Sequence, residues 1–196
     1  MPAAVMPAEI ENPEITQDLA ELDAVLTEFD ELVAGLEDEG FCWRPEPGRW
    51  SIGECMDHLS VTAALYEPVL EECMREGRAA GRTGIGKPRR GILNRLFLWL
   101  MAPPVRGKVK APGSFLPAAI ASKQEVCSRF SDRHGRLRRS MIEADGLDLW
   151  RNRLVSPASN LIRLSLGEAF ALLLTHMRRH LWQARQVRQA PGFPAS

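Results

Sequence analysis

Near the end of the chain lies the stretch Leu174-Thr175-His176-Met177-Arg178-Arg179-His180-Leu181-Trp182-Gln183. Its two histidines stand four residues apart, which places both imidazoles on one face of a helix, one turn apart. Two imidazoles in that arrangement can bind one metal ion. A third histidine, His58, lies in an upstream segment that also has a helical pattern, and the chain has only 4 histidines. The stretch therefore predicts both a helix and a candidate metal centre.

The helix that carries this histidine pair is predicted to run to about Gln189. Ser165-Leu166-Gly167-Glu168 fits a capping box at its start, and Pro191 and Gly192 follow its end. Its apolar stripe comprises Leu166, Ala169, Phe170, Leu173, Leu174, Met177 and Leu181. The two histidines lie along the inward edge of that stripe, and the arginines Arg178, Arg179 and Arg185 are expected to point away from it.

A first long helix is predicted from Pro13 to about Glu39, with Asn12 as its N-cap and Gly40 at its end. Its apolar residues recur at alternating spacings of four and three, which is the pattern of a heptad seam. They are Ile15, Leu19, Leu22, Leu26, Phe29, Val33 and Leu36. A loop is expected over residues 41–50, where prolines and a glycine gather.

Two further helices complete the pattern. One opens at the capping box Ser51-Ile52-Gly53-Glu54 and carries His58 at the flank of its apolar stripe. The other starts at Pro117, ends near Gly146 and has His134 on its seam. Four long amphipathic helices indicate an all-α fold, a four-helix bundle. Residues 147–164 are interpreted as an ordered loop without a reliable strand pattern.

The domain organisation follows from these elements. We expect a flexible tail over residues 1–12, one bundle over 13–190, and a C-terminal tail over 191–196. A long crossover with an insert at 77–116 separates the second and third helices. The insert has a basic, glycine-rich loop at 77–91 and a short apolar element at 92–101 that contains Phe97 and Trp99.

Charge is distributed unevenly although the formal net charge is zero. Residues 1–80 hold 4 Lys and Arg against 19 Asp and Glu, whereas residues 81–196 hold 21 against 6. These two halves could pair within one fold, pair across a homodimer, or leave a basic surface free. The balanced total gives no reason to expect nucleic-acid binding.

The cysteines and the N-terminus bear on the compartment. Cys42, Cys55, Cys73 and Cys127 form no CxxC pair, so we interpret them as buried, reduced thiols of a cytosolic protein. No basic segment followed by a long apolar run opens the chain, so no signal peptide is expected. The protein is therefore expected to be cytoplasmic.

Two blocks of sequence resemble the DinB-like superfamily. One is Trp43-Arg44-Pro45-Glu46-Pro47-Gly48-Arg49-Trp50-Ser51-Ile52-Gly53-Glu54 followed by His58-Leu59. The other is the HxxxH stretch His176-Met177-Arg178-Arg179-His180-Leu181-Trp182-Gln183. The resemblance covers about residues 13 to 190. It implies a four-helix bundle with a long crossover and a divalent transition metal, Zn, Ni or Fe, bound by His58, His176 and His180. Without it, the same residues fit three ordinary half-buried histidines.

The resemblance also implies a class of chemistry. Characterised relatives include S-transferases and isomerases that use a low-molecular-weight thiol as cosubstrate, and others are metal-dependent hydrolases. We therefore expect a metal-dependent enzyme of transferase or hydrolase type that activates a water or a thiol and acts on a small-molecule substrate. The alternative is a non-catalytic, stress-related binding module. That module would dock a partner or a membrane surface through the basic residues 82–110.

A few other residues are candidates for supporting roles. Glu54, Asp57 and Gln183 could orient the imidazoles. His134 could carry protons beside the metal, although a core histidine with its hydrogen bonds satisfied is the commoner case. Trp50 and Trp182 are interpreted as packing anchors.

Overall fold

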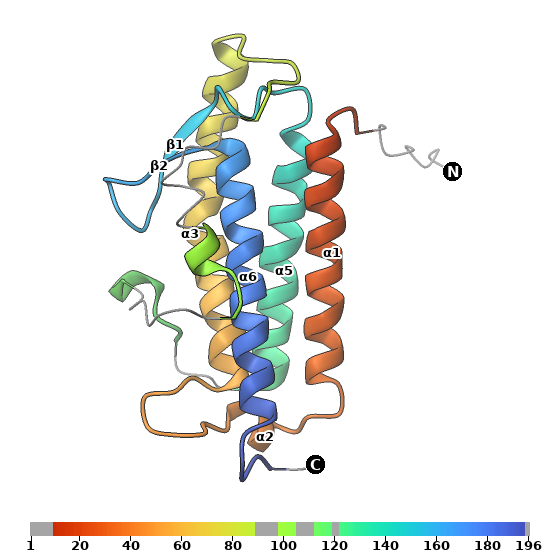
Figure 1. Ribbon diagram of the computed structural model, residues 1–196, viewed down its shortest axis with the longest axis vertical. Coiled ribbons are helices and arrows are strands. Elements are labelled where there is room, and N and C mark those ends of the chain that lie inside the picture. The colour runs from red at the N-terminus through yellow and green to blue at the C-terminus, as the bar shows by residue number, and fades with distance from the viewer. Residues whose placement is uncertain (1–9, 89–97, 105–111, 119–121, 195–196) are drawn as a thin grey trace.

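The computed structural model describes residues 10–88, 98–104, 112–118 and 122–194 (Figure 1). The expected all-α bundle is confirmed. Four long helices stand side by side: α1 (Pro13–Val33), α3 (Ile52–Ala79), α5 (Lys123–Glu143) and α6 (Leu166–Arg188). Both α1 and α3 pack against α5 and α6, so α1 and α3 occupy opposite corners. One continuous apolar core fills the space between the four helices.

Polar caps fix where these helices begin. The side chain of Asn12 accepts a hydrogen bond from the Glu14 N–H at the start of α1. Ser51 and Ser165 form complete capping boxes with Glu54 and Glu168 at the starts of α3 and α6, as their sequences predict. The two helices that carry the candidate ligands therefore start at fixed points.

The predicted end of the first helix is wrong. Helix α1 stops at Val33, because Gly35 adopts a positive φ of 71° that turns the chain. Leu36 is buried all the same, in the turn rather than in a helix. A short helix, α2 (Asp38–Cys42), follows and includes the first two residues of the predicted loop.

The crossover between α3 and α5 also differs from expectation at both ends. Helix α3 continues to Ala79, three residues into the predicted insert. Helix α5 begins at Lys123 with Ser122 as N-cap, not at Pro117. Between them, residues 98–101 are helical and η1 (Gly113–Phe115) forms one short 3-10 turn. Phe97 and the other residues of 89–97 and 105–111 lie outside the described residues, as does most of the N-terminal tail.

A small β-hairpin replaces the loop expected over residues 147–164. Strand β1 (Arg153–Val155) pairs antiparallel with β2 (Arg163–Ser165), and β2 leads directly into α6. Each strand has three residues, too few to give a period-two pattern in the sequence. Within the described ranges, no helix is long and apolar enough to cross a membrane.

Ion pairs join the acidic and basic halves of the chain within the one bundle. Arg178 of α6 binds Glu21 and Glu28 of α1, and Arg138 of α5 binds Asp23. Arg129 and Arg133 of α5 bind Asp57 and Glu67 of α3 respectively. Since later residues of α5 pair with later residues of α3, the two helices run parallel. Only a long crossover can connect parallel neighbours, which explains the position of the insert.

The four cysteines are free thiols, as predicted, but only two are buried. Cys55 and Cys73 lie on the inner side of α3, where burial raises the pKa of the Cys73 thiol to about 11. Cys42, at the end of α2, is exposed and Cys127 is half-buried. The prediction of burial is therefore wrong for Cys42.

Candidate metal centre

Three imidazoles converge between α3 and α6. The Nε2 atom of His176 lies 3.2 Å from that of His58 and 3.1 Å from that of His180. One ligand atom from each ring lies within 4.8 Å of the other two. Nitrogens bound to one metal at about 2.0–2.1 Å stand roughly 3.0–3.4 Å apart, so the observed separations suit a shared ion.

The positions of the three histidines on α3 and α6 explain why their rings converge. His58 lies about two turns after the N-cap Ser51 of α3, on the side that packs against α6. His176 and His180 lie near the middle of α6, and their four-residue spacing turns both rings to the same side. The sequence-predicted trio is thus brought together by two helices that start at opposite ends of the bundle (Figure 1).

Hydrogen bonds set which nitrogen of His58 is free. Its Nδ1 lies 2.6 Å from the carbonyl oxygen of Phe115 and donates to it, because a carbonyl can only accept. The lone pair is therefore on Nε2, which faces the other two histidines. No hydrogen bond of standard geometry reaches the buried Nδ1 of His180. The Gln183 side chain interacts with the same ring and raises its pKa, against the larger lowering by burial.

Burial favours the neutral form of all three rings. It lowers the pKa of His58, and it lowers the pKa of His180 well below its ordinary value. The pKa of His176 falls to about 3 because of burial, with smaller electrostatic contributions from His58 and Arg179. Neutral imidazole is the form that binds metals. Three lone-pair nitrogens crowded around one point, in a buried setting, are a donor set that fits a divalent cation.

Trp50 forms one wall of the site. Its ring stacks on His180, with centroids 5.6 Å apart and an angle of 25° between the planes. It also contacts His58 at a centroid distance of 4.8 Å. The residue predicted as a packing anchor therefore packs against the candidate ligands themselves. Trp182, the other predicted anchor, is half-buried on α6.

Arg179 was expected to point away from the bundle, and this expectation is wrong. Its side chain is 8% exposed, and its guanidinium donates to the carbonyl oxygen of Leu100 in the insert at 3.4 Å. Its charge lowers the pKa of both His176 and His180, so it lies beside the site. Position 179 is three residues after His176, and residues at that spacing are neighbours on a helix. The spacing therefore predicts that Arg179 lies near His176.

The remaining candidates lie further from the imidazole nitrogens. Glu54 caps α3 and binds Arg44, so it orients no ligand directly. Asp57 accepts the N–H of Ala118 at 2.7 Å rather than contacting His58. Sequence reasoning missed Phe115, whose contribution is a backbone carbonyl and therefore leaves no signature in the residue type.

His134 is buried on α5 but is not one of the converging three. Its Nδ1 donates to the carbonyl oxygen of Phe130 at 2.7 Å, and burial lowers its pKa to about 4. A cavity of about 10 Å³ lies between it and His176, at the lower limit for one water molecule. These contacts are those of a core histidine with a satisfied Nδ1.

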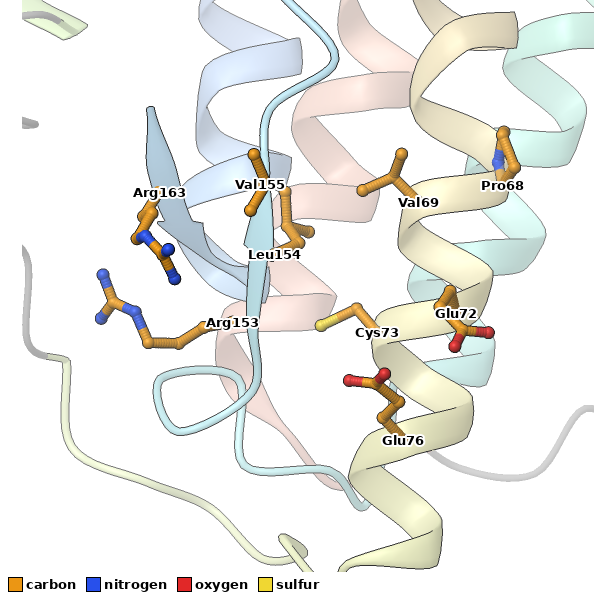
Figure 2. Close-up of a pocket in the computed structure, with 9 residues that line it drawn as sticks. All are labelled: Pro68, Val69, Glu72, Cys73, Glu76, Arg153, Leu154, Val155 and Arg163. Carbon is orange, nitrogen blue, oxygen red and sulfur yellow. The ribbon is translucent and has the colours of Figure 1, made fainter. Parts of the chain in front are cut away.

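A larger cleft, of about 530 Å³, lies elsewhere on the bundle (Figure 2). It is enclosed by the second half of α3 and the hairpin, and Cys73, Glu76, Arg153 and Arg163 are among its lining residues. Cys73 is fifteen residues after His58 on the same helix, about 22 Å along its axis. The cleft is therefore separate from the three histidines.

The chain belongs to the DinB superfamily, whose family model matches residues 21–184. The match includes all three histidines of the cluster and confirms the resemblance seen in the sequence. No curated protein and no solved structure matches the chain at a significant level. The DinB superfamily is metal-binding, which agrees with the geometry of the three rings.

Proposed function

We propose that His58, His176 and His180 bind one divalent transition metal, Zn, Ni or Fe, through their Nε2 atoms. The observation that carries this proposal is the convergence of the three nitrogens, at 3.1 and 3.2 Å, on two buried rings and one half-buried ring, that of His176. We further propose that the protein is a metal-dependent enzyme of hydrolase or thiol S-transferase type.

The chain's own residues suit that chemistry. When bound, a metal would lower the pKa of a coordinated water or low-molecular-weight thiol and so supply a nucleophile near neutral pH. Three protein ligands leave a coordination position open, as in catalytic sites. Trp50 covers one side of the rings and excludes water there. Arg179 adds a positive charge that would attract the anionic groups of a cosubstrate.

Elemental analysis of the purified protein tests the metal first. About one transition-metal ion per chain is expected, and it should be lost in His58→Ala, His176→Ala and His180→Ala. His134→Ala is the matched control, because that ring is as buried as those of His58 and His180 but is not one of the converging three. Full occupancy in His176→Ala, or equal loss in all four variants, would contradict the proposed ligand set. Thiol-transfer and hydrolysis assays on the loaded protein would then separate the two reaction types.

One observation favours a second function, docking to a membrane surface or partner. Trp99 and Leu100 of the insert are 53% and 43% exposed, within a strongly basic segment. A pull-down with anionic liposomes tests this role. It compares the unchanged full chain with a double variant that carries Trp99→Ala and Leu100→Ser. Loss of sedimentation in the double variant would support docking, and no sedimentation of the full chain would exclude membrane binding.

A further inference from the structure

Asp57 is a buried carboxylate directly before His58. The residue is 1% exposed, so its charge needs partners. One oxygen accepts the backbone N–H of Ala118 at 2.7 Å, and the other lies 2.7 Å from the guanidinium of Arg129 on α5. Asp57 therefore ties three segments together: α3, α5 and residues 112–118 of the crossover.

The same crossover segment also contacts His58. The carbonyl oxygen of Phe115 accepts from Nδ1 of His58, and the Phe115 side chain is buried in the core. Asp57 and His58, neighbours on α3, thus bind two backbone groups of the crossover, the N–H of Ala118 and the carbonyl of Phe115. The position of the Phe115 carbonyl depends on this attachment, because residues 112–118 contain only the three-residue turn η1 as regular structure.

We propose that Asp57 and Arg129 are positioning residues for the metal centre. Arg129 pairs with Asp57, and Asp57 binds the N–H of Ala118 and so fixes residues 115–118 against α3. The Phe115 carbonyl in turn keeps the proton of His58 on Nδ1 and its lone pair on Nε2. The end of the insert is then a structural part of the metal centre. This inference rests on the proposed metal site, but the arrangement of His58 can be measured without metal.

A simpler role for Asp57 would be to join α3 to α5. The chain contains a matched pair for comparison: Glu67 of α3 binds Arg133 at 3.1 Å and Arg136 at 3.2 Å, both on α5. Glu67 lies nearly three turns further along α3 and has no hydrogen bond to residues 112–118 among those described. Glu67→Gln therefore weakens the same helix pair without disturbing the insert.

The experiment compares Asp57→Asn, Arg129→Met and Glu67→Gln in the full chain. Zn²⁺ affinity is measured by competition with a chromophoric chelator. In the metal-free protein, ¹⁵N shifts report the His58 tautomer, and hydrogen–deuterium exchange reports the protection of residues 113–118. Arg129 has a side chain that is 43% exposed, so its variant should fold even if Asp57→Asn does not. Thermal melts compare the overall stability of the variants.

Asp57→Asn and Arg129→Met should weaken Zn²⁺ binding at least about tenfold, the lower range for groups that orient a ligand. They should also speed exchange at residues 113–118 and mix the two His58 tautomers, while Glu67→Gln changes none of these. An unchanged tautomer in Arg129→Met, or an equal effect of Glu67→Gln, would overturn the inference. Wild-type protein that binds none of Zn²⁺, Ni²⁺ and Fe²⁺ would refute the proposed function, and the tautomer and exchange data would still decide the positioning role.

Discussion

Nδ1 of His58 lies 2.6 Å from the carbonyl oxygen of Phe115, a residue 57 positions further along the chain. This contact links the helical bundle to the insert at the candidate metal centre. The insert could be taken from its sequence for a solvated loop, yet it supplies the acceptor that fixes one ligand's tautomer. Arg179 makes a second link between site and insert through the carbonyl of Leu100. Both contacts reach the site from outside the bundle.

Trp50 should report metal binding. Its ring lies 4.8 Å from that of His58 and 5.6 Å from that of His180, so a paramagnetic ion bound by these imidazoles would quench its fluorescence. Titration of the metal-free protein with Co²⁺ or Ni²⁺ should reduce tryptophan emission and saturate at about one ion per chain. Trp50→Phe should lose most of this change. Equal quenching in Trp50→Phe would indicate that the ion binds elsewhere.

Arg178 should contribute measurably to stability. Its guanidinium lies 2.5 and 3.0 Å from the two carboxylate oxygens of Glu21 and also binds Glu28, with a side chain that is only 26% exposed. Arg178→Met should lower the free energy of unfolding by about 1–2 kcal/mol, a value reduced for partial solvent screening. Urea denaturation measures the change. Arg75→Met is the control, because its pair with Glu72 is exposed, and it should leave the midpoint unchanged.

The sequence predicted best those features that depend on residue type and spacing. Ser51 and Ser165 cap the helices as expected, and the four-residue spacing of His176 and His180 turns both rings to one side. These features are local, so one helix suffices to produce them. The same local rules place the start of α1 correctly, after Asn12.

Features that depend on the backbone or on distant segments were missed. The heptad pattern continues through Leu36, but the helix ends at Val33. Leu36 is buried without being helical, because burial requires only that its side chain face the core. The start of α5 at Lys123 follows from capping by Ser122 rather than from the proline at 117. The Phe115 carbonyl belongs to every amino acid, so no residue pattern could have marked it.

His134 should make the stability of the metal-free protein depend on pH. Burial lowers its folded-state pKa to about 4, whereas the unfolded value is about 6.5. Between these values the unfolded state binds more protons, so stability falls as pH decreases through this window. The slope from this residue is at most about 1.4 kcal/mol per pH unit. Urea melts from pH 7 to 4 should show a shallower slope for His134→Leu. Parallel curves would mean that His134 is accessible to protons in the folded state.

A chelator should distinguish the metal-bound histidines from ordinary core residues. Metal binds neutral imidazole, and the unfolded chain takes up protons below about pH 6.5 while the metal-bound rings do not. An ion that binds the folded state more tightly than the unfolded chain adds stability by mass action. That increment is therefore present at neutral pH and decreases as pH falls below about 6.5.

The measurement is a thermal melt at pH 7.5 and at pH 5, with and without chelator. Chelator should lower the melting temperature at pH 7.5 and have little effect at pH 5. The apolar core spans the whole bundle and does not depend on the ion, so the metal-free protein should remain folded at pH 7.5. In His176→Ala the chelator should have no effect at either pH. A chelator effect of equal size at both pH values, or in His176→Ala, would show that the stabilising ion is not bound by the three histidines.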